Sequence, residues 1–460
     1  MYVRYLFLFI LFALGVSGCM EESSDVALPQ RRSLGKEFRI FKPPEKPAET
    51  QETSEISEPN GPITLPEALA LALLHNPELK AFSWDVRVSE AKRLQATLLP
   101  NPEFEVEVEE AGGPGQRSDF DGAETAIQLS QLIELGGKRS KRTKLASLEK
   151  ELAGWDYEAK RLDVFTGAAK AFNEVLAAQQ GLKLTQELLQ VSEELVNTVT
   201  QRVDAGKDSP LEKTKAAVAL SNVKIQHQKA IQYLQFTRKQ LAATWAGNSP
   251  KFESVIGQLD SLSPIPFIED LTDLIKRNPD LARWSLEIDK GKAALELEKA
   301  KAISDITLSG GLQRFNETDD NAIVFGISIP LPISDKNQAG KLQAGYELAR
   351  AREEQRAAYN RVRMKLVKSY QALSNAYTEA TELDKNVLRG AEDVFEASKT
   401  GYTQGKLDYL NVLDAQRTLF EAKARYIDAL ASYHIAKADV ERLTGRPIDS
   451  ETVSKREDSK

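Results

Sequence analysis

The sequence predicts a mainly α-helical protein with a transmembrane β part, built from a duplicated unit of long coiled-coil helices plus four β-strands. Three observations support this prediction. The same motifs recur at an offset of about 200 residues. Two long stretches carry apolar residues at steps of three and four, which is typical of supercoiled helices. Four segments of about ten residues alternate apolar and polar side chains, which indicates strands with one apolar face.

The composition favours an ordered helical protein without a cofactor. The chain has 460 residues, of which 41% are hydrophobic and 28% are charged, and Ala, Leu, Glu, Lys and Gln are frequent. The net charge of -7 argues against nucleic acid as a partner, because phosphate binding needs a broad basic field. With one cysteine and three histidines, neither a disulfide framework nor a soft-metal site is expected.

Residues 1–18 are predicted to be a signal peptide. Arg4 precedes an apolar run too short to span a bilayer, and the run ends in Ser17 and Gly18. Cys19 follows at once, which resembles a bacterial lipoprotein signal and predicts lipidation of Cys19. The alternative is an ordinary signal peptide with an incidental cysteine. Residues 19–61, rich in Pro, Glu and Ser, are predicted to form a lipid-anchored flexible tether, and residues 448–460 a charged tail.

The remaining chain divides into two structural repeats, 62–250 and 251–447. Four pairs of segments match in order: HNPEL with RNPDL, LIELGGKR with PLPISDKN, RVDAGKDSPLEK with GYTQGKLDYLNV, and QLAATWAG with ADVERLTG. This period is too long for a solenoid, so we interpret it as a duplication that forms one pseudo-symmetric unit.

Each repeat is expected to open with a helix. Thr64 and Glu67 form a capping box with Pro66 in the first turn, and the helix should continue to about Leu99. A break is expected at Asn76-Pro77, because the residue before proline disfavours the helical conformation.

Two strands should follow the opening helix in each repeat. The expected ranges are 103–110 and 124–133 in the first repeat, and 306–315 and 322–333 in the second. Ile127 and Leu129 share one face with Gln128 and Ser130 opposite, and the other segments alternate in the same way.

A long helix should then extend from Lys138 to about Arg202, with a counterpart around residues 359–387. Its apolar residues recur at close to 3.5 positions, which indicates left-handed supercoiling. Glycine-bearing turns at 204–210 and 403–408 are expected to return the chain along a shorter helix.

The four strands with one apolar face could lie in a lipid bilayer or in water. They have the length needed to cross a bilayer, yet natural membrane barrels begin at about eight strands. An open sheet edge is not tolerated in lipid, so several chains would have to share one barrel. The alternative is a small soluble sheet with one wet face. The lipoprotein signal and the long coiled-coil helices favour the shared barrel.

At this point the repeated order of helix, two strands, long helix, turn and return helix resembles the TolC-type outer-membrane efflux proteins, from about Ile63 to Gly445. The segment GYTQGKLDYLNVLDAQRTL is similar to the second helix-turn region of that family, and LSQLIELGGKR resembles its cobalt–zinc–cadmium-type heavy-metal branch. The resemblance implies a homotrimer with a shared trimeric β-barrel and a periplasmic α-helical barrel. It also implies two partners, a periplasmic adaptor protein and an inner-membrane resistance–nodulation–division pump.

The resemblance also assigns roles to several residues. The two turns would form periplasmic tips that contact the adaptor, through Arg202, Gly206, Ser209, Gly405, Asp408 and Leu410. The alternative is a plain helical hairpin that needs glycine. Asp414 matches an acidic position at the tunnel entrance of relatives, whereas Asn411 replaces an acid found in another relative. A solvated helix charge is the alternative for Asp414.

Two charged groups need a separate explanation. Basic residues at a helix N-terminus oppose the helix dipole, so Lys138, Arg139 and Arg142 are predicted to contact anionic headgroups of outer-membrane lipid. The alternative is a solvated helix face. In the segment EFEVEVEE, four glutamates (Glu103, Glu105, Glu107 and Glu109) would face a water-filled lumen, with Phe104, Val106 and Val108 facing lipid. Acidic rings favour cations in a pore. The alternative is that any polar residue would serve there.

No nucleophile–base pair, phosphate loop or catalytic carboxylate pair occurs in the sequence, so an enzyme is not expected. The predicted function is a passive exit duct of a tripartite efflux system, with heavy-metal cations as the expected cargo. Two alternatives are the same duct for organic drugs or secreted protein, and a periplasmic adaptor lipoprotein. Two equivalent hairpins, each entered through a strand pair, argue against the adaptor.

Overall fold

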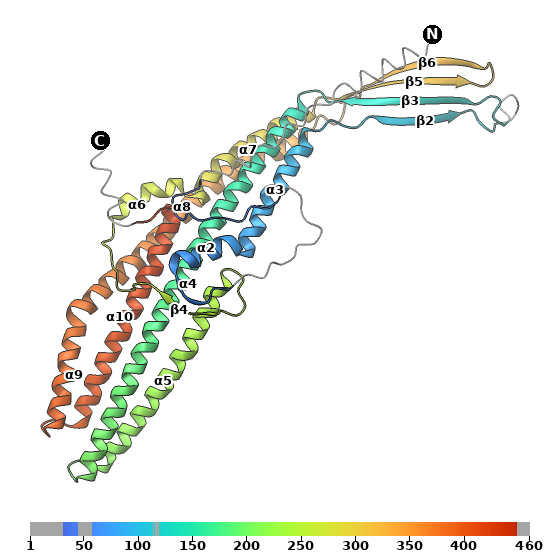
Figure 1. Cartoon of the computed structure of the whole chain (residues 1–460). Helices are drawn as coiled ribbons and strands as arrows, with labels where there is room; N and C mark the ends of the chain where they lie inside the picture. The colour runs from blue at the N-terminus through green and yellow to red at the C-terminus, as the bar shows by residue number, and fades with distance from the viewer. Residues whose placement is uncertain (1–30, 45–57, 114, 116–118, 449–460) are drawn as a thin grey trace.

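A computed structural model describes residues 31–44, 58–113, 115 and 119–448 of the chain. Figure 1 shows an elongated molecule with a β-sheet at one end and two long helical hairpins at the other. Cys19, the signal peptide and all but the first residue of the charged tail lie outside the described residues.

The first repeat contains two strands that enter the sheet and two long helices. Its elements in order are β1 (Gly61–Thr64), α2 (Leu65–His75), α3 (Pro77–Thr97), β2 (Glu103–Glu109), β3 (Glu124–Ile133), α4 (Lys138–Asp204) and α5 (Pro210–Ala243). The predicted helix break at Asn76-Pro77 is confirmed. The Glu67 carboxylate accepts from the Thr64 backbone N–H at 2.7 Å, as the capping box predicts, and also from the Thr64 hydroxyl at 2.8 Å.

The second repeat follows the same plan with more interruptions. Its elements are β4 (Phe252–Ile256), α6 (Ile268–Leu274), the 3₁₀ turn η2 (Ile275–Arg277), α7 (Pro279–Lys301), β5 (Ile306–Phe315), β6 (Asp320–Ser328), α8 (Gln338–Glu382), the π-helical segment η3 (Leu383–Val387), α9 (Leu388–Thr403) and α10 (Tyr409–Thr444). The π segment lies at the end of the stretch, around residues 359–387, in which the sequence predicted a long helix.

The four-stranded sheet is antiparallel in the order β2-β3-β5-β6, so β2 and β6 form its edges. Residues directly opposite in an antiparallel sheet share a face. The row Val106, Ile127, Leu312 and Ile323 therefore lies on one face, whereas the row Glu103, Ser130, Ser309 and Gly326 lies on the other. The alternation read from the sequence is confirmed across all four strands.

Strand β6 is shorter than expected. The sequence predicted a strand to residue 333, but pairing ends at Ser328. Pro330 and Pro332 follow, and proline has no backbone N–H to donate to a ladder.

The long helices form a layer in which α5 packs on α4, α4 on α10, and α10 on α8 and α9. In the lower hairpins the core between α4, α9 and α10 is apolar and aromatic, with Leu195, Val199, Phe395, Tyr402 and Tyr409 all buried. The short strands β1 and β4 pair in parallel and join the two repeats beside α4, a contact that the sequence did not predict. None of the described helices is long and apolar enough to cross a membrane.

Residues 31–44 correct the expectation of a tether that is flexible throughout. Arg161, on α4 and fully buried, donates to the backbone carbonyl oxygens of Leu34 at 2.9 Å and Gly35 at 3.3 Å. Ile40 is buried in the core formed by α2, α3 and α4. Composition alone misled here, because a few apolar side chains and exposed carbonyls suffice to fix a segment on a helix surface.

Candidate functional site

The hairpin tips are built by glycine turns that reverse the helix direction. Gly206 and Gly405 adopt left-handed backbone conformations with φ of 70° and 73°, which side-chain-bearing residues disfavour. Each turn ends at the N-cap of a return helix, Ser209 for α5 and Asp408 for α10. The Ser209 hydroxyl accepts from the Leu211 N–H at 3.2 Å, which satisfies one free donor at the start of α5.

The two tips of one chain are tied together by Arg202, Asp208 and Tyr402. The Arg202 guanidinium donates to both carboxylate oxygens of Asp208, at 2.7 and 2.9 Å, and lies 4.7 Å from the centre of the Tyr402 ring. The Tyr402 hydroxyl, from the other hairpin, donates to Asp208 Oδ2 at 2.7 Å. Figure 1 shows the two tips side by side at the end of the molecule away from the sheet.

These contacts shift the pKa values of Asp208 and Tyr402. The hydrogen bonds from Arg202, with the bond from Tyr402, hold the pKa of the Asp208 carboxyl below its usual range. Burial, together with the bond to Asp208, raises the pKa of the Tyr402 hydroxyl, so this hydroxyl stays a donor at neutral pH.

Sequence reasoning missed Asp208 and Tyr402. The two repeats align Gly206 with Gly405, so Asp208 corresponds to Leu407 and Tyr402 to Val203. Since the two members of the bond occupy non-equivalent positions of the duplication, the repeat gave no signal for their contact. The sequence offered one cue, which is that Arg202 and Asp208 have opposite charges and flank Gly206.

The remaining predicted tip and tunnel residues are placed on the surface of the lower hairpins. Asp408 and Leu410 are exposed beside the Gly405 turn. Asn411 and Asp414 are exposed on α10, one helical turn apart, near the same end. They therefore form a polar stretch of α10 that is free to meet a partner or solvent.

At the opposite end, the four glutamates of β2 lie together on the polar face of the sheet. Glu103, Glu105, Glu107 and Glu109 alternate along the strand, and all are exposed. Their direct neighbours on β3 are Ser130, Gln128, Ala126 and Glu124. The apolar face carries exposed Phe104, Val106, Ile127, Phe325 and Ile327. The sheet therefore has one polar, acidic face and one apolar face.

The junction between the sheet and α4 contains the predicted basic cluster. Lys138 Nζ lies 2.8 Å from Asp305, and Arg142 lies 2.6 Å from Glu134. Arg142 also donates to the carbonyl oxygens of Ala96 and Leu98. Two of the three predicted headgroup residues are thus bonded within the chain, whereas Arg139 is exposed.

The motif ELGG at this junction has a structural explanation. Gly136 and Gly137 both have φ of 68°, so the chain can turn sharply from β3 into α4. A Cβ at Gly136 would lie 2.8 Å from the Ile303 side chain, just beyond the end of α7, and 3.2 Å from the Ala300 carbonyl oxygen, so a side chain there would be crowded. The Leu135 N–H donates to Asp305 at 2.8 Å and completes the turn.

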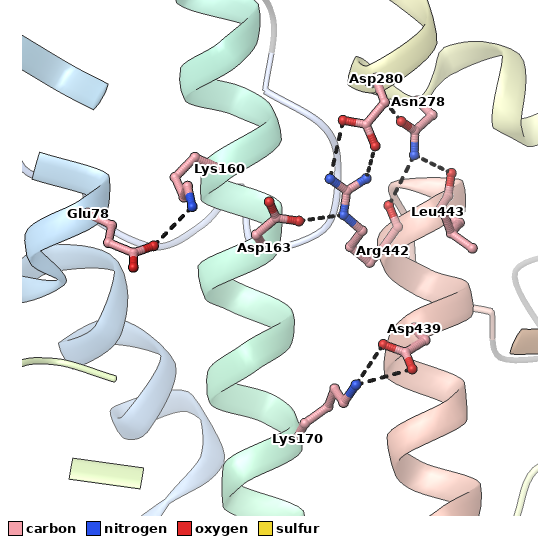
Figure 2. Close-up of polar contacts among 9 residues, drawn as sticks. All are labelled: Glu78, Lys160, Asp163, Lys170, Asn278, Asp280, Asp439, Arg442 and Leu443. Atoms are coloured by element: carbon pink, nitrogen blue, oxygen red, sulfur yellow. Dashed lines mark hydrogen bonds and ion pairs between the residues drawn. The ribbon is translucent and has the colours of Figure 1, made fainter. Parts of the chain in front are cut away.

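A polar network holds the two repeats together in the middle of the molecule (Figure 2). Arg442, near the end of α10, lies 2.8 Å from Asp163 on α4 and 2.6 Å from Asp280 on α7. Burial of Arg442 opposes its charge, yet the two carboxylates hold its pKa above the usual value. Nearby, Lys170 on α4 lies 3.0 Å from Asp439 on α10.

The three histidines do not come together. His227 contacts Thr185, and His434 contacts the carbonyl oxygen of Leu259. Among the residues that the structure describes, no group of three or more His, Cys, Asp or Glu side chains could hold a metal ion.

The fold is thus a sheet with one apolar face, continued by long paired helices that end in tied tips. Residues 68–247 and 271–446 match the outer membrane efflux protein family, and the chain belongs to this family. It is therefore an outer-membrane efflux protein.

Relatives and solved structures agree with this assignment. The chain is 35% identical over 386 residues to the cobalt-zinc-cadmium resistance protein CzcC of Cupriavidus metallidurans, covering 84% of this chain and 91% of that one. It is 23% identical over 398 residues to the outer membrane protein TolC of Escherichia coli, covering 81% and 80%. The fold matches the outer membrane protein VceC of Vibrio cholerae with a TM-score of 0.69 at 16% identity, covering 84% and 97%.

Proposed function

We propose that this outer-membrane efflux protein is the passive exit duct of a tripartite system that exports heavy-metal cations. The similarity to a cobalt-zinc-cadmium resistance protein over most of both chains carries the proposal. The acidic face of β2 supports it, because carboxylates lining a lumen favour the passage of cations. The duct itself needs no metal-binding cluster, since an inner-membrane pump would select the cargo.

The proposed assembly is a homotrimer. Each chain supplies four strands with two free edges, and open edges are not tolerated in lipid. Three copies would give a twelve-stranded barrel, within the range of natural membrane barrels. The long helices would continue that barrel as a tunnel through the periplasm. Cys19 would carry the lipid anchor.

The tips are the proposed contact for a periplasmic adaptor, which links the duct to a resistance–nodulation–division pump. Gly206, Gly405 and Leu410 are exposed at this end, and Leu410 offers an apolar side chain that the fold leaves uncovered. The bond from Tyr402 on one hairpin to Asp208 on the other would present both hairpins to the adaptor as one unit.

The proposed contact with anionic lipid headgroups now depends on Arg139, because Lys138 and Arg142 are bonded to carboxylates of the same chain. Replacement of Arg139 with glutamine should weaken binding to vesicles that contain anionic lipid. Equal binding by the two proteins would remove this role.

Deletion of the gene tests the cargo. We expect the deletion strain to become sensitive to zinc, cobalt or cadmium, and complementation with the intact gene to restore growth. The sensitivity of the same strains to copper and to a panel of organic toxicants is measured for comparison. Sensitivity to organic compounds alone would favour the second candidate, a duct for organic molecules, for which the similarity to the outer membrane protein TolC is the supporting observation.

A further inference from the structure

The two junctions between the sheet and the long helices differ, although the repeats place corresponding segments at both. At the first junction, β3 stays paired to its last residue, Ile133, which lies opposite Ile306. Asp305 then fixes the turn into α4, because it accepts from the Leu135 N–H at 2.8 Å and lies 2.8 Å from Lys138 Nζ. The first junction is thus folded onto residues of its own chain.

The second junction, residues 329–336, leaves its apolar side chains uncovered. Pairing of β6 ends at Ser328, before this segment begins. Ile329, Leu331 and Ile333 follow, and they are 49%, 74% and 79% exposed. Three large apolar side chains exposed within five residues form a surface that suits an apolar partner.

These side chains continue the apolar face of β6. Ile323, Phe325 and Ile327 are exposed on that face, and Ile329 and Leu331 keep the same alternation beyond the end of pairing. The whole run covers nine residues. A strand needs about 9–11 residues to cross a bilayer at a tilt. The apolar stripe reaches this length only if the start of the junction lies in lipid as well.

The backbone of the junction suits an apolar environment. Pro330 and Pro332 have no N–H to donate. The Ile333 N–H donates to the Leu331 carbonyl oxygen at 2.9 Å. Three of the five backbone positions in residues 329–333 therefore present no free donor, and free donors are what make an unpaired chain costly in lipid.

Polar and charged residues begin where the apolar side chains stop. Ser334, Asp335 and Lys336 are exposed, and the Asp335 carboxylate accepts from the Asn337 N–H at 2.7 Å at the start of α8. Lys336 has no ion-pair partner in the described part of the chain, whereas its counterpart Lys138 is bonded to a carboxylate. A free ammonium group next to apolar side chains suits the headgroup region of a bilayer.

We propose that residues 329–333 form an interfacial anchor, an unpaired segment that inserts Ile329, Leu331 and Ile333 into the periplasm-facing leaflet of the outer membrane. Lys336 lies at the headgroups of that leaflet. The anchor rests on the proposed barrel, because β6 must lie in the bilayer for its continuation to enter the leaflet. It adds a membrane contact outside the paired strands, at one of the two junctions and not at the other.

Single tryptophans and brominated lipid test the anchor in the full-length protein reconstituted in vesicles. Bromine on an acyl chain quenches only an indole that touches the chain. Leu331→Trp should lose emission most strongly to lipid brominated near the headgroup, because this position lies at the edge of the hydrocarbon.

Ser328→Trp is the matched control, since Ser328 alternates with the apolar positions and faces away from lipid. It should keep its emission in brominated lipid and lose it to aqueous iodide. The native tryptophans all lie in the helical part of the chain, and the emission of the unsubstituted protein is subtracted as background.

Ile327→Trp separates failure of the anchor from failure of the barrel. Its side chain lies on the apolar face of the paired strand, so brominated lipid should quench it if β6 crosses the bilayer. Quenching of Ile327→Trp without quenching of Leu331→Trp or Ile329→Trp would overturn the anchor and leave the barrel standing. A Leu331→Trp that neither lipid nor iodide quenches would place a second copy over the segment, which also contradicts the anchor. No lipid quenching at any of the three positions would overturn both.

Discussion

The hydroxyl of Tyr402 donates to the carboxylate of Asp208 at 2.7 Å, although the two residues belong to different hairpins. Arg202 binds the same carboxylate through two hydrogen bonds and stacks on the Tyr402 ring. One aspartate thus joins both tips of the chain. Arg202 also donates to the Thr403 carbonyl oxygen of the second hairpin at 3.4 Å, so both bonds between the tips involve Asp208 or its partner Arg202.

Replacement of Asp208 with asparagine should loosen the tips. The change removes the charge that Arg202 and Tyr402 both bind, which costs about 1–3 kcal/mol locally. Hydrogen exchange of backbone amides in 203–209 and 401–407 should accelerate by about 5- to 100-fold. Asp204→Asn is the control, since Asp204 is exposed and lies 3.8 Å from Lys213. Equal exchange in both variants would show that the tie contributes nothing.

The same tie should weaken in acid. The folded-state pKa of Asp208 is lowered, so its contribution to stability is present above the ordinary pKa of an aspartate and is lost as the pH falls through the lowered value. Amide exchange at the tips, corrected for the intrinsic pH dependence, should therefore increase at acidic pH in the native protein. In Asp208→Asn this acid response should disappear; its persistence would assign the response to another group.

Asn278 should be the more sensitive of the two duplicated Asn-Pro asparagines. Each donates to the end of its return helix, Asn76 to Thr244 and Asn278 to Leu443, both at 2.8 Å. Each also caps the helix that follows it, Asn76 by accepting from the Leu79 N–H and Asn278 from the Asp280 N–H. The difference is burial, because Asn278 is fully buried and Asn76 only partly. Asn278→Ala should lower the free energy of unfolding by about 2–3 kcal/mol. Denaturant unfolding would measure this, with the exposed Asn222→Ala as a control expected to change it by less than about 0.5 kcal/mol.

The buried pair of Glu158 and Arg161 should hold residues 31–44 on α4. Arg161→Met leaves the Glu158 carboxylate buried without its partner, which costs about 3–5 kcal/mol. The segment should then become accessible to trypsin at Arg32, Lys36 and Arg39. Lys160→Gln removes an exposed pair on the same helix and should leave the segment protected. Slow cleavage in both variants would mean that apolar contacts alone hold the segment.

Local patterns predicted much of this fold. The capping box at Thr64, the helix break at Asn76-Pro77 and the alternation of the strands depend on residues close in sequence, and all three are confirmed. The two-fold repeat also located both tips. These features follow from backbone preferences and from the period of the side chains.

The features that the sequence did not predict depend on partners distant in the chain. Arg161 is bonded to backbone carbonyls more than a hundred positions away, and carbonyls carry no sequence signature. The bond from Tyr402 to Asp208 joins non-equivalent positions of the two repeats. The π segment at 383–387 has no glycine or proline to mark it. Lys138 and Arg142 showed their charge in the sequence but not the carboxylates that neutralise them.

Single-channel recording in a planar bilayer tests the central claim most directly. The purified protein should form discrete pores, and a salt gradient should give a reversal potential that shows cation selectivity. Replacement of Glu103, Glu105, Glu107 and Glu109 with glutamine should keep the pores and move the reversal potential toward zero, because the lumen loses its fixed charge. An unchanged reversal potential would make the acidic face incidental. The absence of any pore would contradict the account of this chain as an exit duct.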